Sequence, residues 1–446
     1  LTGSTCVVGP VLIALWLALL TSCAPSPLDD PWVAHRPLAQ TEATWRPPRL
    51  QGDQSAGAGP TLLRAPTGDL PLRESVALAL LHSPELASFA WSVRAAEARA
   101  IQAGLSPNPR VGYGAENLGG PDGGDLFLRQ TVRLSQVIEL ADKRDKRLRL
   151  AHADQRLAGW DYEAQRLAVV TEAARRHVAV VAAQQRVELA QRTLGLVTQV
   201  RDIVNQRVEA GVVPSAERDK APVRVSVERI ALDRARHDLA AARQALASTW
   251  AGESPTFARA IGDLDDRPVV PDEASLLTRA RNHPRLARWE DELEQRRRAV
   301  TLARANGVPD VTAGVGLRHF PDADDVAGVV EVSVPVPLID RNQGRVLEAR
   351  YELSRAKSLQ TAAEATMRRD LAAAHADLAA SAFALTTLDG ETLPAAQAAF
   401  DAANDAFQQG RSDFLDVLDA ERTLVDVQRQ RIDAREQPYY WLGFRP

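Results

Sequence analysis

One long helical pattern limits what this chain can fold into more than any other feature. From about residue 139 to 209 there is no proline, and Ala, Leu, Arg, Gln and Glu, which are strong helix formers, fill the stretch. Roughly 70 residues at ~1.5 Å each predict a helix on the order of 100 Å long. Apolar residues inside it recur at spacings of three, seven and four, typical of a coiled-coil seam. They are Leu194, Val197, Val204 and Val208.

A strand pattern precedes this helix, and a tight turn follows it. In residues 126–136, LFLRQTVRLSQ, apolar and polar residues alternate, which predicts a strand with one apolar face. The segment AGVVP, Ala210–Pro214, ends the long helix, and a second helical run returns to about Trp250. Strand, long helix, turn and returning helix form one unit.

The unit occurs twice. Several residues of the first half recur about two hundred positions later, and a duplicated, fused chain explains matches at so constant an offset. The pairs are Pro84 and Pro284, Leu86 and Leu286, Pro109 and Pro309, Val111 and Val311, Gly114 and Gly314, and Gly211 and Gly410.

The two copies have the same predicted plan. Residues 71–252 form the first copy, 253–272 are a linker, and 273–446 form the second copy. The remaining expected elements are a helix over 71–104 with one proline step and a strand over 110–117, then a helix over 273–306, strands over 310–319 and 328–337, and a long helix from 343. Gly390 and Pro394 predict a kink in that last helix.

The N-terminal segment is typical of a secreted precursor. Residues 7–20 are almost wholly apolar, too short to span a bilayer comfortably, and they predict a signal peptide over 1–22. The following Leu20–Ala24, LTSCA, resembles a bacterial lipobox, so Cys23 is the expected lipidation site; an ordinary signal with a chance cysteine is the alternative. Residues 23–70 then form an extended, lipid-anchored tether. Because Cys6 lies in the cleaved segment, no disulfide is expected.

Composition and motifs exclude several classes of function. The chain has 45% hydrophobic but only 5% aromatic residues, as in helical bundles. Its net charge of −4 does not indicate a surface that binds nucleic acid. HExxH, GxxxxGK, GxSxG and CxxC motifs are absent and the eight histidines are scattered, so we expect no enzyme activity, no cofactor and no metal site. Two β-hairpins cannot close a barrel, but their alternating faces suit a membrane barrel to which several chains contribute strands.

Five segments together resemble the TolC-like outer membrane factor family, and in particular its heavy-metal efflux branch. They are LPLRESVALALLHSPEL at 70–86, LSQVIELADKR at 134–144, EAGVVPSAERD at 209–219, VSVPVPLIDRNQGR at 332–345 and QQGRSDFLDVLDAERTL at 408–424. The resemblance implies a mainly α-helical fold with membrane β-strands: a homotrimer with a twelve-stranded barrel, four strands per chain, continued by an α-helical tunnel. One departure is Ala141, which stands where the family usually has glycine.

The resemblance also implies roles for individual residues. Asp416 and Asp419 match carboxylates that ring the periplasmic mouth of the tunnel, where they would form a gate. Three residues apart, they share a helix face, and the alternative is the polar side of a helix start, where acidic groups suit the helix dipole. Gly211 and Gly410 would form the tip turns that contact a periplasmic adaptor.

The expected function is therefore an outer membrane exit duct that passively conducts heavy-metal cations. Its implied partners are an adaptor (membrane fusion) protein, an inner-membrane proton-driven pump and the lipids of the outer membrane. A duct for multidrug efflux or type I protein secretion is the alternative. A third reading is a periplasmic coiled-coil lipoprotein that scaffolds other proteins without forming a channel.

Overall fold

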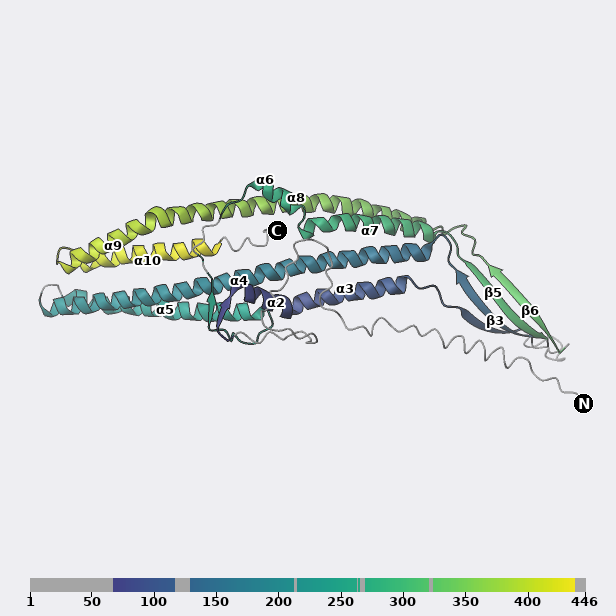
Figure 1. The fold of residues 1–446 in the computed structure, drawn as a ribbon, viewed down its shortest axis with the longest axis horizontal. Helices are drawn as coiled ribbons and strands as arrows, with labels where there is room; N and C mark the ends of the chain where they lie inside the picture. Colours follow the sequence, from purple (N-terminus) through teal and green to yellow (C-terminus); the bar gives the residue numbers. More distant parts are fainter. Residues whose placement is uncertain are drawn as a thin grey trace, which may run out of the picture. The chain divides into compact units, whose positions relative to one another are not determined.

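The computed structural model describes residues 67–116, 129–211, 215–262, 264, 269–320 and 324–437 (Figure 1). All of these residues belong to one compact unit, Leu50–Pro446. The expected signal peptide and Cys23 lie outside the described residues. Helices dominate the described chain, and the fold is mainly α-helical with a small antiparallel sheet.

The first copy begins with two helices separated at a proline. Ser83 ends the first of them, and its Oγ accepts a hydrogen bond from the backbone N–H of Leu86 at 3.3 Å. Pro84 then occupies the first position of the next helix, where the missing N–H costs nothing. The elements of this copy are β1 (Asp69–Pro71), α2 (Leu72–His82), α3 (Pro84–Ala103), β2 (Arg110–Glu116), β3 (Arg129–Ile138), α4 (Lys143–Glu209) and α5 (Ser215–Ser248).

The second copy repeats this order. Pro284 opens a helix as Pro84 does, and here the ring Nδ1 of His283 caps the backbone N–H of Arg285 at 3.2 Å. Strand β4 (Arg259–Ile261) lies in the segment between the copies. The elements of the second copy are α6 (Glu273–Ala280), α7 (Pro284–Asn306), β5 (Val311–Phe320), β6 (Asp325–Ser333), α8 (Gln343–Thr387), the π-helical segment η2 (Leu388–Thr392), α9 (Leu393–Gln408) and α10 (Phe414–Glu436).

Several predicted boundaries need correction. The rod expected over 139–209 is confirmed as the 67-residue α4, although it begins at Lys143. The helix expected over 273–306 is two helices, α6 and α7, because the residue before Pro284 is disfavoured in a helix. The kink expected near Gly390 appears as η2, which separates α8 from α9. Strand β6 ends at Ser333 rather than 337, since Pro335 and Pro337 have no N–H to donate.

A parallel pair of three-residue strands, β1 and β4, joins the start of the first copy to the segment between the copies. This pair was not predicted. It packs on α4 in a core that contains Leu70, Val180 and Phe257, each fully buried. His177 of α4 lies in the same core, where its Nε2 donates to the Ile261 carbonyl at 3.1 Å and its Nδ1 accepts from Ser75 Oγ at 2.8 Å. Burial lowers the pKa of His177, so this bridge uses the neutral ring.

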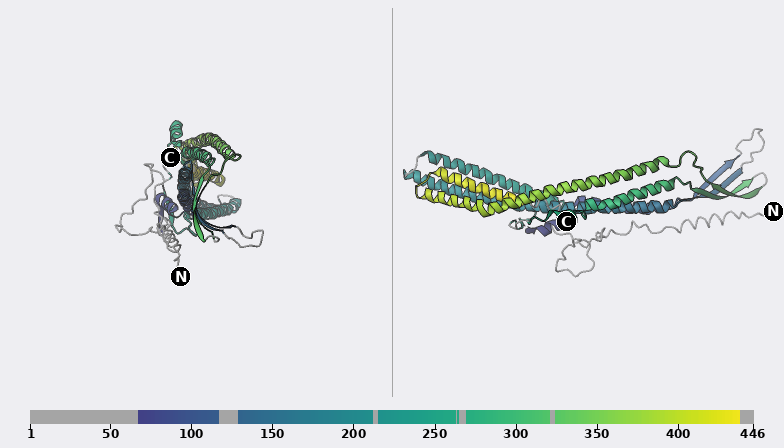
Figure 2. Two further views of the ribbon diagram at one scale, coloured as in Figure 1. Left: turned by 90° about the vertical axis from the view of Figure 1, so that its right-hand side faces the viewer. Right: turned by 90° about the horizontal axis from the view of Figure 1, so that it is seen from above.

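The second sheet has four antiparallel strands in the order β2–β3–β5–β6, so that β3 of the first copy pairs with β5 of the second. The strands lie at one end of the long helices, and the helix-to-helix turns lie at the other (Figure 2). Because α4 runs without interruption from the strands to the turn, the two ends are about 100 Å apart, at ~1.5 Å per residue.

Candidate functional site

The four-stranded sheet has one apolar face that no described residue covers. The register aligns Val132 with Tyr113 on one side and with Leu317 on the other, so their side chains share a face. Val111 is 73% exposed and Val330 is 80% exposed, far more than apolar side chains in a soluble sheet. The exposed apolar residues of the face are Val111, Tyr113, Val132, Val315, Leu317, Val326, Val330 and Val332.

The opposite face of the sheet is charged. Arg133 on β3 pairs with Glu331 on β6 across the intervening strand β5. Arg318 donates from Nε to Thr131 Oγ1 at 3.1 Å, and its Nη2 lies 3.5 Å from a carboxylate oxygen of Glu116. Polar groups on one face and apolar groups on the other are the pattern of a barrel wall between lipid and water.

The edges of this sheet are open. Strands β2 and β6 are the outer members of the four-stranded order, so each has a partner on one side only among the described residues. Open edges do not occur within the hydrocarbon region of a membrane, because unpaired backbone groups are costly there. Within a membrane, such a sheet would need further strands along β2 and β6.

Residues with left-handed backbone angles connect the sheet to the long helices. Ala141 has φ +57° and Asp142 has φ +52°, and in the second copy Asn342 has φ +61°. An ion pair joins the copies at this level, with Lys143 Nζ 2.6 Å from Asp310 Oδ1. Ala141, the residue that departs from the family's glycine, thus takes a conformation that glycine adopts without strain.

The turns between long helices each contain a left-handed glycine. Gly211 has φ +70° and Gly410 has φ +72°. A cation links the two turns: Arg207 donates from Nη2 to the Gln408 carbonyl at 2.8 Å, and its guanidinium lies 4.2 Å from the centre of the Phe407 ring. The tips of the two copies therefore lie side by side, at the end opposite the sheet.

Both predicted gate residues are exposed in the single chain. The Asp416 carboxylate accepts the backbone N–H of Asp413 at 3.3 Å, as part of a capping box at the start of α10. Asp419 is on the next turn of the same helix. This capping role agrees with the alternative to the gate, in which Asp416 belongs to the polar side of a helix start. The capping box uses one carboxylate oxygen of Asp416 and leaves the other available to other groups.

Sequence reasoning missed a buried charge cluster beside the predicted gate residues, at Glu421, two positions beyond Asp419 on α10. Arg224 Nη2 on α5 lies 3.0 Å from Glu228 Oε1 and 3.0 Å from Glu421 Oε2 of α10. Glu228 is 3% exposed and Glu421 is 2% exposed. Burial raises the pKa of Glu421, although the charge of Arg224 opposes that change. The available signal was a glutamate at a seam position of each helix.

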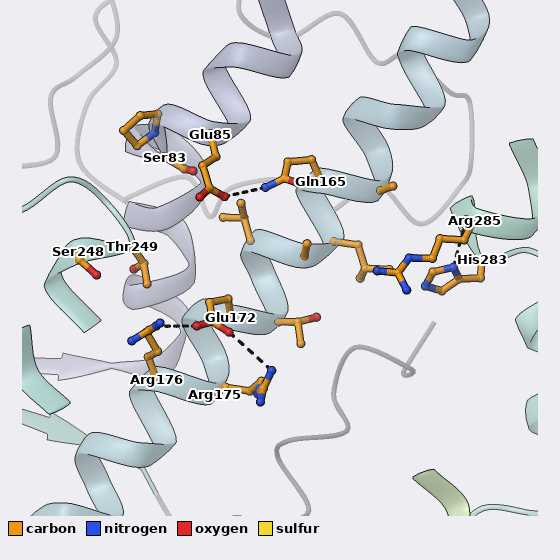
Figure 3. Close-up of a pocket in the computed structure, with 16 residues that line it drawn as sticks. Ser83, Glu85, Gln165, Glu172, Arg175, Arg176, Ser248, Thr249, His283 and Arg285 are labelled. Atoms are coloured by element: carbon orange, nitrogen blue, oxygen red, sulfur yellow. Dashed lines mark hydrogen bonds and ion pairs between the residues drawn. The ribbon is translucent and has the colours of Figure 1, made fainter. Parts of the chain in front are cut away.

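A groove of about 750 Å³ lies between the start of α3, the middle of α4 and the start of α7 (Figure 3). Its acidic side chains are occupied by neighbours: Glu85 accepts from Gln165 at 3.0 Å, and Glu172 accepts from Arg176 Nε at 2.6 Å. Throughout the described part of the chain, no group of three or more His, Cys, Asp or Glu side chains is placed to hold a metal ion.

Comparison with known proteins agrees with this architecture. The chain is 30% identical to the cobalt-zinc-cadmium resistance protein CzcC of Cupriavidus metallidurans, over 87% of this chain and 92% of CzcC. It is 26% identical to the nickel-cobalt-cadmium resistance protein NccC of Alcaligenes xylosoxydans xylosoxydans, over 63% of each chain. The outer-membrane channel CmeC of Campylobacter jejuni has the same fold, with a TM-score of 0.66 and 14% identity, over 84% of each chain.

A family model matches both copies, over residues 76–252 and 278–439. The described fold, the two matched segments and the similarity to CzcC along most of both chains all agree. The chain belongs to the outer membrane efflux protein family.

Proposed function

We propose that three copies of this chain form an exit duct in the outer membrane, through which heavy-metal cations leave the cell. Four strands from each copy would close a twelve-stranded barrel, and the helices below it would form a tunnel into the periplasm. The duct itself would be passive. Energy would come from a proton-driven pump in the inner membrane, and a periplasmic adaptor would connect the pump to the tips.

The observation that carries this proposal is the sheet with an exposed apolar face and two open edges. Such a sheet would aggregate in water and would be unsatisfied in lipid as a single chain. Closure by identical neighbours solves both problems, because β6 of one copy can pair with β2 of the next. A coiled-coil scaffold without a channel would have no use for this apolar face.

The cargo follows from the relatives. CzcC and NccC are named for resistance to cobalt, zinc, cadmium and nickel, and CzcC matches this chain along most of its length. Acidic residues at the tip would favour cations over anions in a narrow opening. We assign this gate role to Asp416 and Asp419, and adaptor contact to the turns at Gly211 and Gly410.

Growth on metal salts tests the function. A strain that keeps its pump and adaptor but lacks its own duct should regain growth on cobalt, zinc and cadmium when this chain is expressed. Antibiotic resistance should change little. Rescue only against antibiotics, or only of the export of a polypeptide, would replace the metal cargo with one of the alternatives. Absence of trimers and of single-channel conductance in planar bilayers would instead contradict the duct itself.

The N-terminal expectation becomes part of this proposal. Cys23 would carry acyl chains that anchor the N-terminal end of the mature chain to the outer membrane, in addition to the barrel. Cys23→Ser should abolish incorporation of labelled palmitate while trimers persist, because barrel insertion and acylation are separate attachments. Cys6→Ser is the matched control and should label like the wild type. Equal labelling of the Cys23→Ser protein would contradict the lipidated cysteine.

A further inference from the structure

A cluster of three charged residues lies where apolar residues are expected, between α5 and α10. On α5, the buried positions Ala221, Val225, Glu228 and Leu232 follow at spacings of four, three and four, which is the seam of a coiled coil. On α10, Glu421 takes the corresponding place on its seam, between buried Val417 and Leu424. Two glutamates therefore occupy core positions near the tip.

A single guanidinium group, that of Arg224, forms ion pairs with both of these carboxylates. Arg224 Nη2 is 3.0 Å from Glu228 Oε1 and 3.0 Å from Glu421 Oε2. Three buried atoms of the cluster have no hydrogen-bond partner, namely Glu228 Oε2, Glu421 Oε1 and Arg224 Nε. With both glutamates ionised, the cluster has a net charge of −1 and two unsatisfied carboxylate oxygens in a buried place. Such a state is costly, because a buried charge needs a partner.

The surroundings offer little further compensation. Arg429, on the same helix as Glu421, is the other cation that acts on it. The neighbouring core contains Val204 of α4 and Phe407 of α9, and the guanidinium of Arg207 on α4 lies against the Phe407 ring. One bound proton removes the excess charge, leaving Arg224 with one carboxylate and giving the other a hydrogen to donate.

We propose that Glu421, held beside Glu228 by their shared partner Arg224, is a buried proton-binding site that strengthens the contact between α5 and α10 when a proton is bound. This contact joins the two copies next to the tip, and α10 also carries Asp416 and Asp419. Loss of the proton would loosen the helix that holds the predicted gate. The proposal goes beyond the exit duct and does not depend on what the duct carries.

The direction of the pH effect follows from proton linkage. Burial raises the pKa of Glu421 in the folded protein, so the packed helices bind the proton more tightly than separated helices do. The stabilisation is fully present below the ordinary glutamate pKa, which is about 4.3, and it is lost as the pH rises through the raised value. The contact is therefore tighter in acid and looser toward alkaline pH.

Hydrogen exchange of the full-length protein in detergent tests the proposal. After correction for the intrinsic pH dependence of exchange, wild-type peptides around Glu228 and Glu421 should be more strongly protected at acid pH than at alkaline pH. The equilibrium constant for local opening of these helices should rise about tenfold for each unit by which the pKa of Glu421 is raised. Glu421→Gln, which imitates the protonated state, should keep high protection at both acid and alkaline pH. Glu228→Gln should do the same, since it also leaves one carboxylate for Arg224.

The matched control is Asp238→Asn, which removes one negative charge from an exposed position of α5 and should keep the wild-type pH dependence. Unchanged pH dependence in Glu421→Gln, or none in the wild type, would overturn the proposal. If that variant does not fold, infrared difference spectra of the wild type give an independent result. A protonated carboxyl band should disappear as the pH rises from acid to alkaline, and its absence would also overturn the proposal. Neither measurement requires transport, so a failure of the proposed cargo would leave both results interpretable.

Discussion

Ala141 combines an ordinary side chain with an unusual backbone. Its φ of +57° places it in the left-handed region, where a Cβ costs about 1 kcal/mol or more relative to glycine. Ala141→Gly should therefore raise the free energy of unfolding, by ~1 kcal/mol per chain. Denaturant titration of the purified trimer measures this change. Ala372→Gly, on an exposed helical position of α8, is the control and should lower stability by ~0.5–1 kcal/mol. Equal loss of stability in both variants would contradict the strain at Ala141.

For single residues, the sequence predicted the role of glycines at turns, but it did not predict the burial of one glutamate. Gly211 and Gly410 were expected at turns because glycine alone adopts left-handed angles freely, and both have positive φ. Glu421 could not be recognised in the same way. It is one glutamate among many in charged helices, and its burial depends on Arg224, 197 positions away in the other copy.

At the scale of helices and strands, long periodic patterns were predictable from the sequence and short segments were not. Helix α4 was predicted nearly to its ends because it lacks proline and carries a continuous seam. The strands β1 and β4 were missed because each has three residues, too few to show a period. Their pairing also joins Leu70 to Ala260, far apart in the sequence, and no local pattern encodes such a contact.

The helix-to-helix turns offer a prediction at the scale of elements. No neighbouring atom lies within 4 Å of a Cβ built on Gly211 or Gly410, so substitution there meets backbone strain but no steric clash. Gly211→Val and Gly410→Val should leave the trimer intact while distorting the turns, and they should weaken metal resistance and adaptor cross-linking. Gly195→Ala, in an equally open position inside α4, is the control and should leave metal resistance and adaptor cross-linking unchanged. Normal resistance with undiminished cross-linking in both turn variants would show that the adaptor contacts another surface.

The proposed barrel depends on which face of the sheet meets lipid. Val330 is on the apolar face and its neighbour Val329 is on the charged face, so the two positions form a matched pair. Val330→Lys should reduce trimer insertion strongly, because a lysine in the middle of the lipid face costs about 2–4 kcal/mol. Val329→Lys should insert normally and place its charge in the lumen. Membrane fractionation and trimer yield measure both effects, and equal yields would contradict the assigned orientation of the sheet.

The proposed gate depends on charges that only the proposed trimer would bring together. In one chain, Asp416 and Asp419 face away from the core, and Asp416 also caps α10. Three copies would bring six carboxylates to one opening. Their bonds to neighbouring chains would hold it closed, each worth ~1–3 kcal/mol where a charge is involved. Any test must therefore separate the loss of charge from the loss of the cap.

Substitution by asparagine makes this separation, because its side-chain oxygen can still accept the Asp413 N–H. The double variant Asp416→Asn, Asp419→Asn should raise single-channel conductance in planar bilayers and admit large antibiotics that the wild type excludes. Three symmetry-related losses together suffice to shift a closed state that is favoured by a few kcal/mol. Asp401→Asn with Asp405→Asn, exposed on α9 before the turn, removes the same charge and should change conductance little. If the two double variants conduct alike as intact trimers, these carboxylates do not hold the duct closed, and capping of α10 is sufficient to explain Asp416.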